Sequence, residues 1–155
     1  MRAYIAIGSN LGEREEIIEN GIRSIEAQIG PILARSSTWE TAPYGVTDQP
    51  DFLNLAVLVE TKLEPEPLLH TMLSIEKEQH RVRKIHWGPR TLDLDLIYYE
   101  DRILHTEDLI LPHPDRKNRA FVLGPLAEIA PDYLDPEYHV TIQELYEELK
   151  KNPPD

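Results

Sequence analysis

The order in which strand-like and helix-like segments follow one another restricts the fold of this chain more than any other feature of its sequence. Apolar residues alternate with a period of two in some segments and recur every three or four residues in others, which distinguishes half-buried strands from amphipathic helices. Glycine and proline separate several of the segments, for example at Gly30 and Pro31. The predicted order is a strand at 3–7, a helix at 13–29, strands at 32–39 and 52–61, a helix that opens at Pro65, and a strand at 92–99.

This order of strand, helix, strand, strand, helix and strand is that of ferredoxin-like folds, in which helices cover one face of an antiparallel sheet. The predicted fold class is therefore α+β with a βαββαβ core. Apolar spacing also predicts extra C-terminal helices near 121–129 and 142–150, and a short edge strand at 109–111. Because the chain has 155 residues and shows no internal repeat or linker, we expect residues 1–155 to form a single domain.

Composition and charge exclude several classes of protein. Hydrophobic residues make up 41% and charged residues 28%, which is typical of a globular domain. The chain has no cysteine, so any metal must be held by oxygen or imidazole, which points to a hard cation. A net charge of −12 argues against binding to nucleic acid or to an anionic membrane. No apolar run approaches the roughly 20 residues that span a bilayer, and no secretory leader is seen, so we expect a cytoplasmic protein.

The strongest local signal is the acidic pair in the predicted strand at 92–99. Successive side chains of a strand point to opposite faces, so Asp93 and Asp95 share one face and the leucines between them share the other. Two adjacent carboxylates repel each other unless a cation neutralises them, and oxygen ligands of this kind select magnesium or manganese. The pattern therefore predicts a metal site, although an acidic strand face exposed to solvent would give the same spacing.

Basic residues lie next to this acidic pair in the sequence. Arg81, Arg83, Lys84 and Arg90 fall within one predicted loop of the two aspartates. Phosphoryl transfer needs this combination, because magnesium bridges phosphate oxygens while arginine and lysine stabilise the developing charge. The sequence has no P-loop motif, so side chains rather than a glycine-rich loop would bind the phosphates. A solvated basic loop is the alternative interpretation.

Two further clusters complete the candidate site. The segment at 112–121 places His113 and three cations before a predicted helix, and His113 could donate to a phosphate oxygen or serve only the structure. The second cluster is apolar and aromatic, and its members are Phe52, Asn54, Trp87 and Phe121, together with residues 41–44. Flat heteroaromatic rings stack on aromatic side chains, and an asparagine amide can read the edge of a pterin or purine. Ordinary core packing would explain the phenylalanines equally well.

Four sequence strings, taken in their order and spacing, resemble the 6-hydroxymethyl-7,8-dihydropterin pyrophosphokinase family. They are IAIGSNL at 5–11, DQPDFLN at 48–54, WGPRTLDLD at 87–95 and Pro-His at 112–113. The resemblance implies a ferredoxin-like monomer that binds ATP with two magnesium ions and then the pterin. It further implies transfer of the β,γ-pyrophosphate of ATP to the hydroxymethyl oxygen of the pterin, giving AMP and the pterin diphosphate in folate biosynthesis.

The resemblance also implies a role for each candidate residue. Asp93 and Asp95 would hold the metals, and the residues closest to the transfer would be Arg81, Arg90 and Asp95. Contacts to ATP would come from Glu76, Arg81, Arg83, Lys84, Arg90, His113 and Arg119. The pterin would lie between Phe52 and Phe121, and its further contacts would come from Thr41, Ala42, Tyr44, Asn54, Trp87 and Asp95.

Rival functions differ from this one in testable ways. A catalytically silent ligand-binding module on the same fold would not need Asp93, Asp95, Arg81 and Arg90 together. A different metal-dependent phosphoryl or nucleotidyl transferase would not need the cluster around Phe52. RNA binding, which some ferredoxin-like sheets perform, is disfavoured by the acidic balance of the chain and by the lack of a basic aromatic motif.

Overall fold

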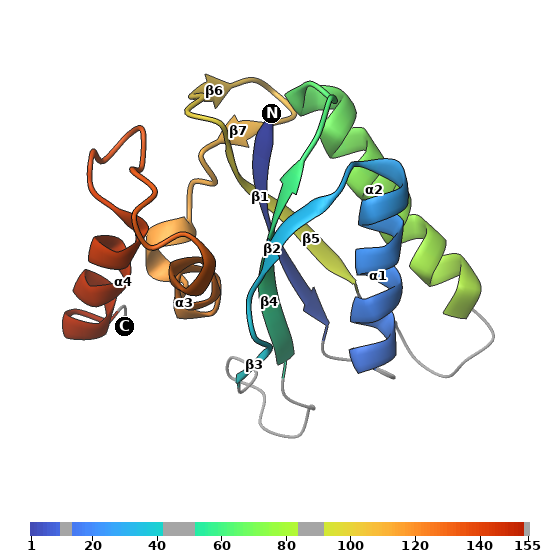
Figure 1. Cartoon of the computed structure of the whole chain (residues 1–155), viewed down its shortest axis with the longest axis horizontal. Helices are drawn as coiled ribbons and strands as arrows, with labels where there is room; N and C mark the ends of the chain where they lie inside the picture. Colours follow the sequence, from blue (N-terminus) through green and yellow to red (C-terminus); the bar gives the residue numbers. More distant parts are fainter. Residues whose placement is uncertain (10–13, 42–51, 84–91, 154–155) are drawn as a thin grey trace.

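A five-stranded antiparallel sheet forms the centre of the protein (Figure 1). The computed structural model describes residues 1–9, 14–41, 52–83 and 92–153. The strands lie in the spatial order β2 (Ile32–Arg35), β4 (Phe52–Glu60), β1 (Arg2–Ser9) and β5 (Asp93–Tyr99), and β3 (Trp39–Thr41) also pairs with β4. The strand predicted at 52–61 is β4, which lies between β2 and β1 and is buried on both faces. This topology confirms the predicted α+β, ferredoxin-like fold.

Strand β1 sets the register of the part of the sheet that carries the predicted site. Gly8 pairs with Asn54 on β4 and with Asp93 on β5, and Ala6 pairs with Asp95. Side chains directly opposite each other in a ladder point to the same face of a sheet. The register therefore brings Asn54, Asp93 and Asp95 onto one face of the sheet. Gly8 and Ala6 of β1 lie between Asn54 on one side and the two aspartates on the other.

Helices α1 (Arg14–Gln28) and α2 (Pro65–Arg83) cover the opposite face with aliphatic side chains. The apolar positions that predicted these helices are buried here, namely Ile18, Ile22, Ile25, Ile29, Leu68, Met72 and Ile75. They pack against Ile5, Ile7, Leu55, Val57, Leu94 and Leu96 of the sheet. This continuous aliphatic core supplies the main hydrophobic stabilisation of the fold.

Helices α3 (Ala120–Ile129) and α4 (Ile142–Lys151) pack on the face that carries Asp93 and Asp95. Figure 1 shows them on the other side of the sheet from α1 and α2. Their core partners on the sheet are Tyr4, Ala56, Leu58, Ile97 and Tyr98. The sequence predicted both helices but not this placement, so the sheet is covered on two faces where one was expected.

The predicted strand at 32–39 is divided into β2 and β3. Ser36 lies between them, and its Oγ accepts a hydrogen bond from the backbone N–H of Ala56 at 2.9 Å. The side chain thus takes a place that a backbone carbonyl would occupy in a continuous strand. The predicted edge strand at 109–111 is present as β7 (Ile110–Leu111), which pairs with β6 (Leu104–His105) in a separate two-stranded sheet.

Local chemistry fixes the two C-terminal helices. Thr141 and Glu144 form a reciprocal capping box at the start of α4, which satisfies backbone donors that the first turn leaves unpaired. In α3, a Cβ at Gly124 would lie 2.2 Å from the ring of Trp39, so only glycine allows this close contact with β3. No helix in the part of the chain that the structure describes is long and apolar enough to cross a membrane.

Candidate active site

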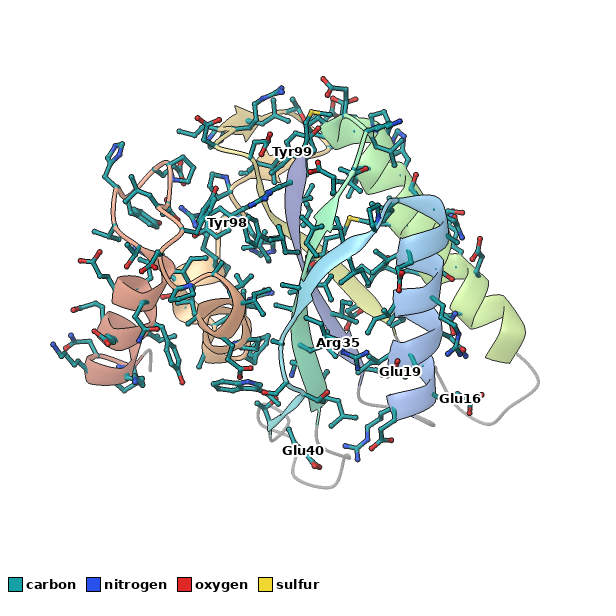
Figure 2. The ribbon with its side chains drawn as sticks, viewed as in Figure 1. Glu16, Glu19, Arg35, Glu40, Tyr98 and Tyr99 are labelled. Atoms are coloured by element: carbon teal, nitrogen blue, oxygen red, sulfur yellow. The ribbon has the colours of Figure 1, made fainter. Side chains whose placement is uncertain are left out.

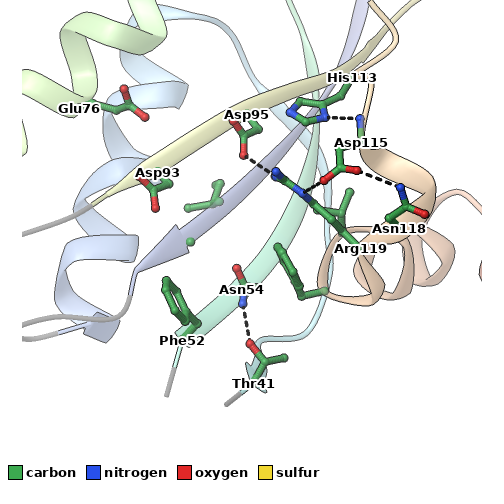
Figure 3. A pocket seen from close by; sticks show the side chains of 15 residues that line it. Thr41, Phe52, Asn54, Glu76, Asp93, Asp95, His113, Asp115, Asn118 and Arg119 are labelled. Carbon is green, nitrogen blue, oxygen red and sulfur yellow. Dashed lines mark hydrogen bonds and ion pairs between the residues drawn. The ribbon is translucent and has the colours of Figure 1, made fainter. Parts of the chain in front are cut away.

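A pocket of about 830 Å³ lies at the end of the sheet face that α3 and α4 cover only in part (Figure 3). This volume is within the range of small-molecule sites in proteins. The pocket brings together nine residues that the sequence singled out: Thr41, Phe52, Asn54, Glu76, Asp93, Asp95, His113, Arg119 and Phe121. Its other lining residues are Ala6, Ile7, Gly8, Asp115, Asn118 and Val122.

The acidic wall of the pocket is built from β5 and α2. Asp93 and Asp95 project from β5, and Glu76 of α2 accepts a hydrogen bond from the backbone N–H of Leu94 at 2.8 Å. Glu76 thereby satisfies a donor on the edge of β5. Burial raises the pKa of Glu76 above its ordinary value, the bond from Leu94 opposes this, and the neighbouring charges of Asp93 and Asp95 raise it further. Negative charge is thus concentrated here, as a cation site requires.

The chemistry of these donors decides which metal they suit. The described residues contain no group of three or more histidine, aspartate or glutamate side chains that could enclose a metal ion on its own. Magnesium is typically held by one or two carboxylates together with waters and substrate phosphates, rather than by a cage of protein ligands. Asp93 and Asp95, both lining an open pocket, fit this mode of binding.

The opposite wall is polar and comes from the segment before α3, which contributes Arg119 as its pocket-lining cation. The Arg119 guanidinium lies 3.8 Å from the Asp95 carboxylate and donates to Asp115 at 3.0 Å. Asp115 also accepts a hydrogen bond from the Asn118 side chain at 3.0 Å. The hydrogen bond from Asn118 has the larger effect and that from Arg119 the smaller, and together they hold the pKa of Asp115 below its ordinary value. Arg119 is therefore held between two carboxylates at the mouth of the pocket (Figure 3).

His113 is held as a neutral donor. Its Nδ1 accepts a hydrogen bond from the backbone N–H of Asp115 at 3.2 Å, so the proton of the neutral ring lies on Nε2. Burial lowers the pKa of His113, Asp95 opposes that change, and Arg119 lowers the pKa further. At neutral pH the ring therefore offers an N–H group rather than a charge.

The third part of the pocket is apolar with one amide group. Asn54 donates from its side-chain nitrogen to Thr41 Oγ at 3.1 Å, which fixes the orientation of the amide. A Cβ at Gly8 would lie 2.8 Å from Asn54 Oδ1, so the glycine leaves room for this oxygen. Phe52 and Phe121 line the same space. An oriented amide between aromatic rings is suited to the edge of a flat heterocycle.

Several predicted site residues cannot be placed. Ala42, Tyr44, Lys84, Trp87 and Arg90 lie outside the described residues. The backbone of Arg81 and Arg83 forms the end of α2, but the description does not extend to their side chains.

The sequence did not single out Asp115, Asn118 or Gly8 as members of the pocket. Asp115 and Asn118 lie in the segment 112–121, in which the sequence analysis considered only the histidine and the cations. The structure corrects the interpretation of Arg116, which was counted among the three cations of the candidate phosphate-binding cluster. Its side chain is 1% exposed and does not line the pocket. Its partners lie about twenty residues further along the chain, beyond the reach of local pattern.

The sequence profile of the 7,8-dihydro-6-hydroxymethylpterin-pyrophosphokinase family matches residues 4–131. Relatives at high identity carry the name 2-amino-4-hydroxy-6-hydroxymethyldihydropteridine pyrophosphokinase. The protein from Methylorubrum extorquens is 46% identical over 132 residues, which cover 84% of each chain. The protein from Bacillus subtilis is 44% identical over 128 residues, covering 82% of this chain and 77% of the relative. The chain belongs to the 7,8-dihydro-6-hydroxymethylpterin-pyrophosphokinase family.

Solved structures support the fold independently. An HPPK-DHPS crystallised in complex with substrates superposes with a TM-score of 0.78 at 16% identity, covering 97% of this chain and 43% of that one. Wild-type HPPK-DHPS of Plasmodium falciparum with pteroate gives a TM-score of 0.79 at 15% identity with the same coverage. This chain thus spans less than half of each of these solved chains. At such identities the likeness concerns the fold alone.

Proposed function

We propose that this protein transfers pyrophosphate from ATP to 6-hydroxymethyl-7,8-dihydropterin, giving AMP and the pterin diphosphate in folate biosynthesis. Membership of the family and the names of the relatives support the reaction. The observation that carries the proposal is the register of β1, which places the Asn54 amide and the Asp93 and Asp95 carboxylates on one sheet face in one pocket. Pterin recognition and phosphate chemistry can therefore occur side by side.

The chemistry of the step defines what the pocket must do. The hydroxymethyl oxygen of the pterin forms a bond to the β-phosphorus of ATP, and the bond from that phosphorus to the oxygen bridging the α-phosphorus breaks. AMP leaves with that oxygen, and the hydroxyl proton must be removed. Asp95, which lines the pocket and is 43% exposed, is proposed to accept the proton or to orient the hydroxyl.

Asp93 and Asp95 are the residues that would hold magnesium, and two ions are part of this proposal. Magnesium, when bound, neutralises phosphate oxygens and the charge that develops on the departing AMP. The protein contributes an acidic wall on a rigid strand, backed by Glu76. A strand fixes the spacing of the two carboxylates, which favours a defined orientation of the ATP phosphates.

Cationic and neutral donors would complete the binding of ATP. His113 would donate its Nε2 proton, and the Arg119 guanidinium, which also lines the pocket, would donate to a phosphate oxygen. Arg81 and Arg90 are proposed to stabilise charge during the transfer, with Arg83, Lys84 and Glu76 in further contacts to the nucleotide.

The pterin is proposed to bind in the apolar part of the pocket. Its ring would stack between Phe52 and Phe121, and its polar edge would hydrogen-bond to the amide of Asn54, which Thr41 orients. Ala42, Tyr44 and Trp87 are proposed to make further contacts. Action in the cytoplasm as a monomer is part of the same proposal.

Product analysis tests the function directly. Purified protein is incubated with ATP, magnesium and 6-hydroxymethyl-7,8-dihydropterin, and adenine nucleotides are quantified with a control lacking the pterin. Pterin-dependent AMP is the expected product, because the pyrophosphate is transferred whole. Formation of ADP would indicate an ordinary kinase. Binding of both ligands without turnover would indicate a silent module.

A further inference from the structure

Arg116 is buried outside the pocket lining, and its guanidinium donates four hydrogen bonds. Its side chain is 1% exposed and that of Asp135 is 0% exposed. The Arg116 guanidinium donates to both oxygens of Asp135, at 2.7 and 3.1 Å, and to Glu137 at 2.9 Å. Burial would raise the pKa of Asp135, but bonds from Arg116, Tyr98 and two backbone N–H groups outweigh it and lower the pKa. The pair is therefore ionised, and each guanidinium nitrogen and each Asp135 oxygen takes part in at least one hydrogen bond.

The same guanidinium holds a residue of the active site. It donates to the backbone carbonyl of His113 at 2.7 Å, while the backbone N–H of His113 donates to the carbonyl of Ile97 on β5 at 3.0 Å. The backbone N–H of His113 is thus fixed by β5, the strand that carries Asp95, and its carbonyl is fixed by Arg116. The short helical turn of residues 116–118 then leads directly to Arg119.

Strand β5 also reaches Asp135. The Tyr98 hydroxyl donates to Asp135 at 2.5 Å, so the buried carboxylate links the strand to the arginine. Figure 2 marks Tyr98 on the side of the sheet that faces α3 and α4. Strand β5 and the segment 113–119, which form the two polar walls of the pocket, are therefore joined outside the pocket lining by one network.

We propose that Arg116 and Asp135 form a positioning pair, which sets His113 and Arg119 opposite Asp95 and thereby determines the affinity for the ATP phosphates. The inference rests on the proposed function, because it assumes that His113 and Arg119 contact those phosphates. Neither member of the pair lines the pocket, so their effect must pass through the residues they hold.

Two observations favour positioning over a purely stabilising role. A buried ion pair is often no more stabilising than apolar residues of the same volume, so stability alone explains it weakly. The guanidinium also uses its planar fork to bond Asp135 and the His113 carbonyl at once, which a lysine could not reproduce. The family profile ends at residue 131, so Asp135 lies outside the matched segment.

The test separates stability from positioning by replacing both partners. The double variant Arg116→Met with Asp135→Asn removes both charges but keeps an acceptor for the backbone N–H groups of Glu137 and Tyr138. The melting temperature is measured together with the affinity for an ATP analogue that carries a methylene group between the α- and β-phosphorus. We expect a melting temperature within a few degrees of wild type, at least tenfold weaker analogue binding, and a raised KM for ATP.

Two further variants make the test decisive. Arg116→Lys keeps the cation beside Asp135 but loses the fork, and it should weaken analogue binding at least fivefold even if the double variant does not fold. The control Arg35→Met with Glu19→Gln removes an exposed pair, joined at 3.2 Å on the edge of the sheet, and should change neither affinity nor KM (Figure 2). At saturating ATP, the KM for the pterin should stay within twofold in all variants.

The outcomes distinguish this inference from the proposed function. Wild-type binding of the analogue in folded double or lysine variants would overturn the positioning role and leave the proposed function intact. An equal rise in the KM values of ATP and pterin would overturn it too, because it would indicate general loosening. If the wild-type protein neither binds the analogue nor forms AMP, the proposed function is wrong, and the positioning role that rests on it is wrong as well.

Discussion

The two faces of the sheet use the same strands for different purposes. On the face covered by α1 and α2, the buried side chains of β1, β4 and β5 are mainly aliphatic. On the other face, the core formed with α3 and α4 is richer in aromatic side chains, and it gives way to the pocket toward Asp93. Alternation along a single strand is enough to separate these environments.

The difference shows how a small domain can carry polar chemistry without losing its core. Leu94 and Leu96 stabilise one face, while Asp93 and Asp95, their neighbours in sequence, line the pocket on the other. Mutations on the first face should therefore alter stability, and mutations at the end of the second should alter activity.

The largest effect is expected from Asp95→Ala. Loss of this carboxylate should lower turnover by at least about 10³-fold, equivalent to about 4 kcal/mol of transition-state stabilisation, measured as AMP formed per minute. The melting temperature should not fall, because the side chain is 43% exposed. Asp132→Ala, at an exposed aspartate outside the pocket, is the control. Activity within about tenfold of wild type would remove Asp95 from the chemistry.

The reverse pattern is expected on the aliphatic face. Ile25 is 0% exposed, and Ile25→Ala should lower the free energy of unfolding by about 2–5 kcal/mol, because it leaves a cavity in packed surroundings. Chemical denaturation measures this change, and kcat under folding conditions should be unaltered. Leu73→Ala removes a side chain that is 45% exposed and should change stability by less than about 0.5 kcal/mol. A large loss of kcat in folded Ile25→Ala would contradict the separation of the two faces.

A smaller effect is expected from Gly8→Ala. The new Cβ would lie 2.8 Å from Asn54 Oδ1 and displace the amide, so the pterin should bind about tenfold more weakly, or about 1.4 kcal/mol. Calorimetric titration with the ATP analogue present measures this loss. Gly21→Ala, whose Cβ would meet Leu92 on the aliphatic face, should leave pterin affinity unchanged and affect only stability. Equal affinities for Gly8→Ala and wild type would show that Asn54 does not read the pterin.

The smallest effect concerns the pH dependence of stability. The pKa of Asp135 is lower in the folded protein than its ordinary value, so the unfolded chain binds this proton first as the pH falls. Its contribution is full above the ordinary aspartate pKa of about 3.9 and is lost as the pH drops through the folded value. Denaturation at decreasing pH should therefore show a shallower loss for the Arg116→Met, Asp135→Asn variant than for wild type. Parallel curves would contradict the assignment of Asp135 as an ionised carboxylate.

Much of the fold was predictable because the periodicities are local. The isoleucines of α1 and the alternating residues of β5 report their own burial, whatever the rest of the chain does. The same parity correctly predicted that Asp93 and Asp95 share a face. Nine of the candidate residues then met in one pocket, since the ferredoxin-like order determines which strands are neighbours.

The features that were missed depend on contacts between distant segments. The local sequence around Arg116 is typical of surface cations, and nothing in it indicates the buried ion pair with Asp135. The break between β2 and β3 depends on Ser36 meeting Ala56 across the sheet. The placement of α3 required Trp39 to lie against Gly124. Long-range packing overrides local pattern in each case.

The pairing of Gly8 with both Asn54 and Asp93 also limits how this chain can change in length. A shift of β5 by one residue against β1 would turn both aspartates toward α1 and α2 and the leucines toward the pocket, since each shift of one residue exchanges the faces. A single-residue insertion or deletion within β1, β4 or β5 should therefore be more damaging than one in a connection that carries no proposed site residue, such as residues 100–103. A library of single-residue deletions, selected for growth without added folate, would test this by comparing positions within the three strands with residues 100–103.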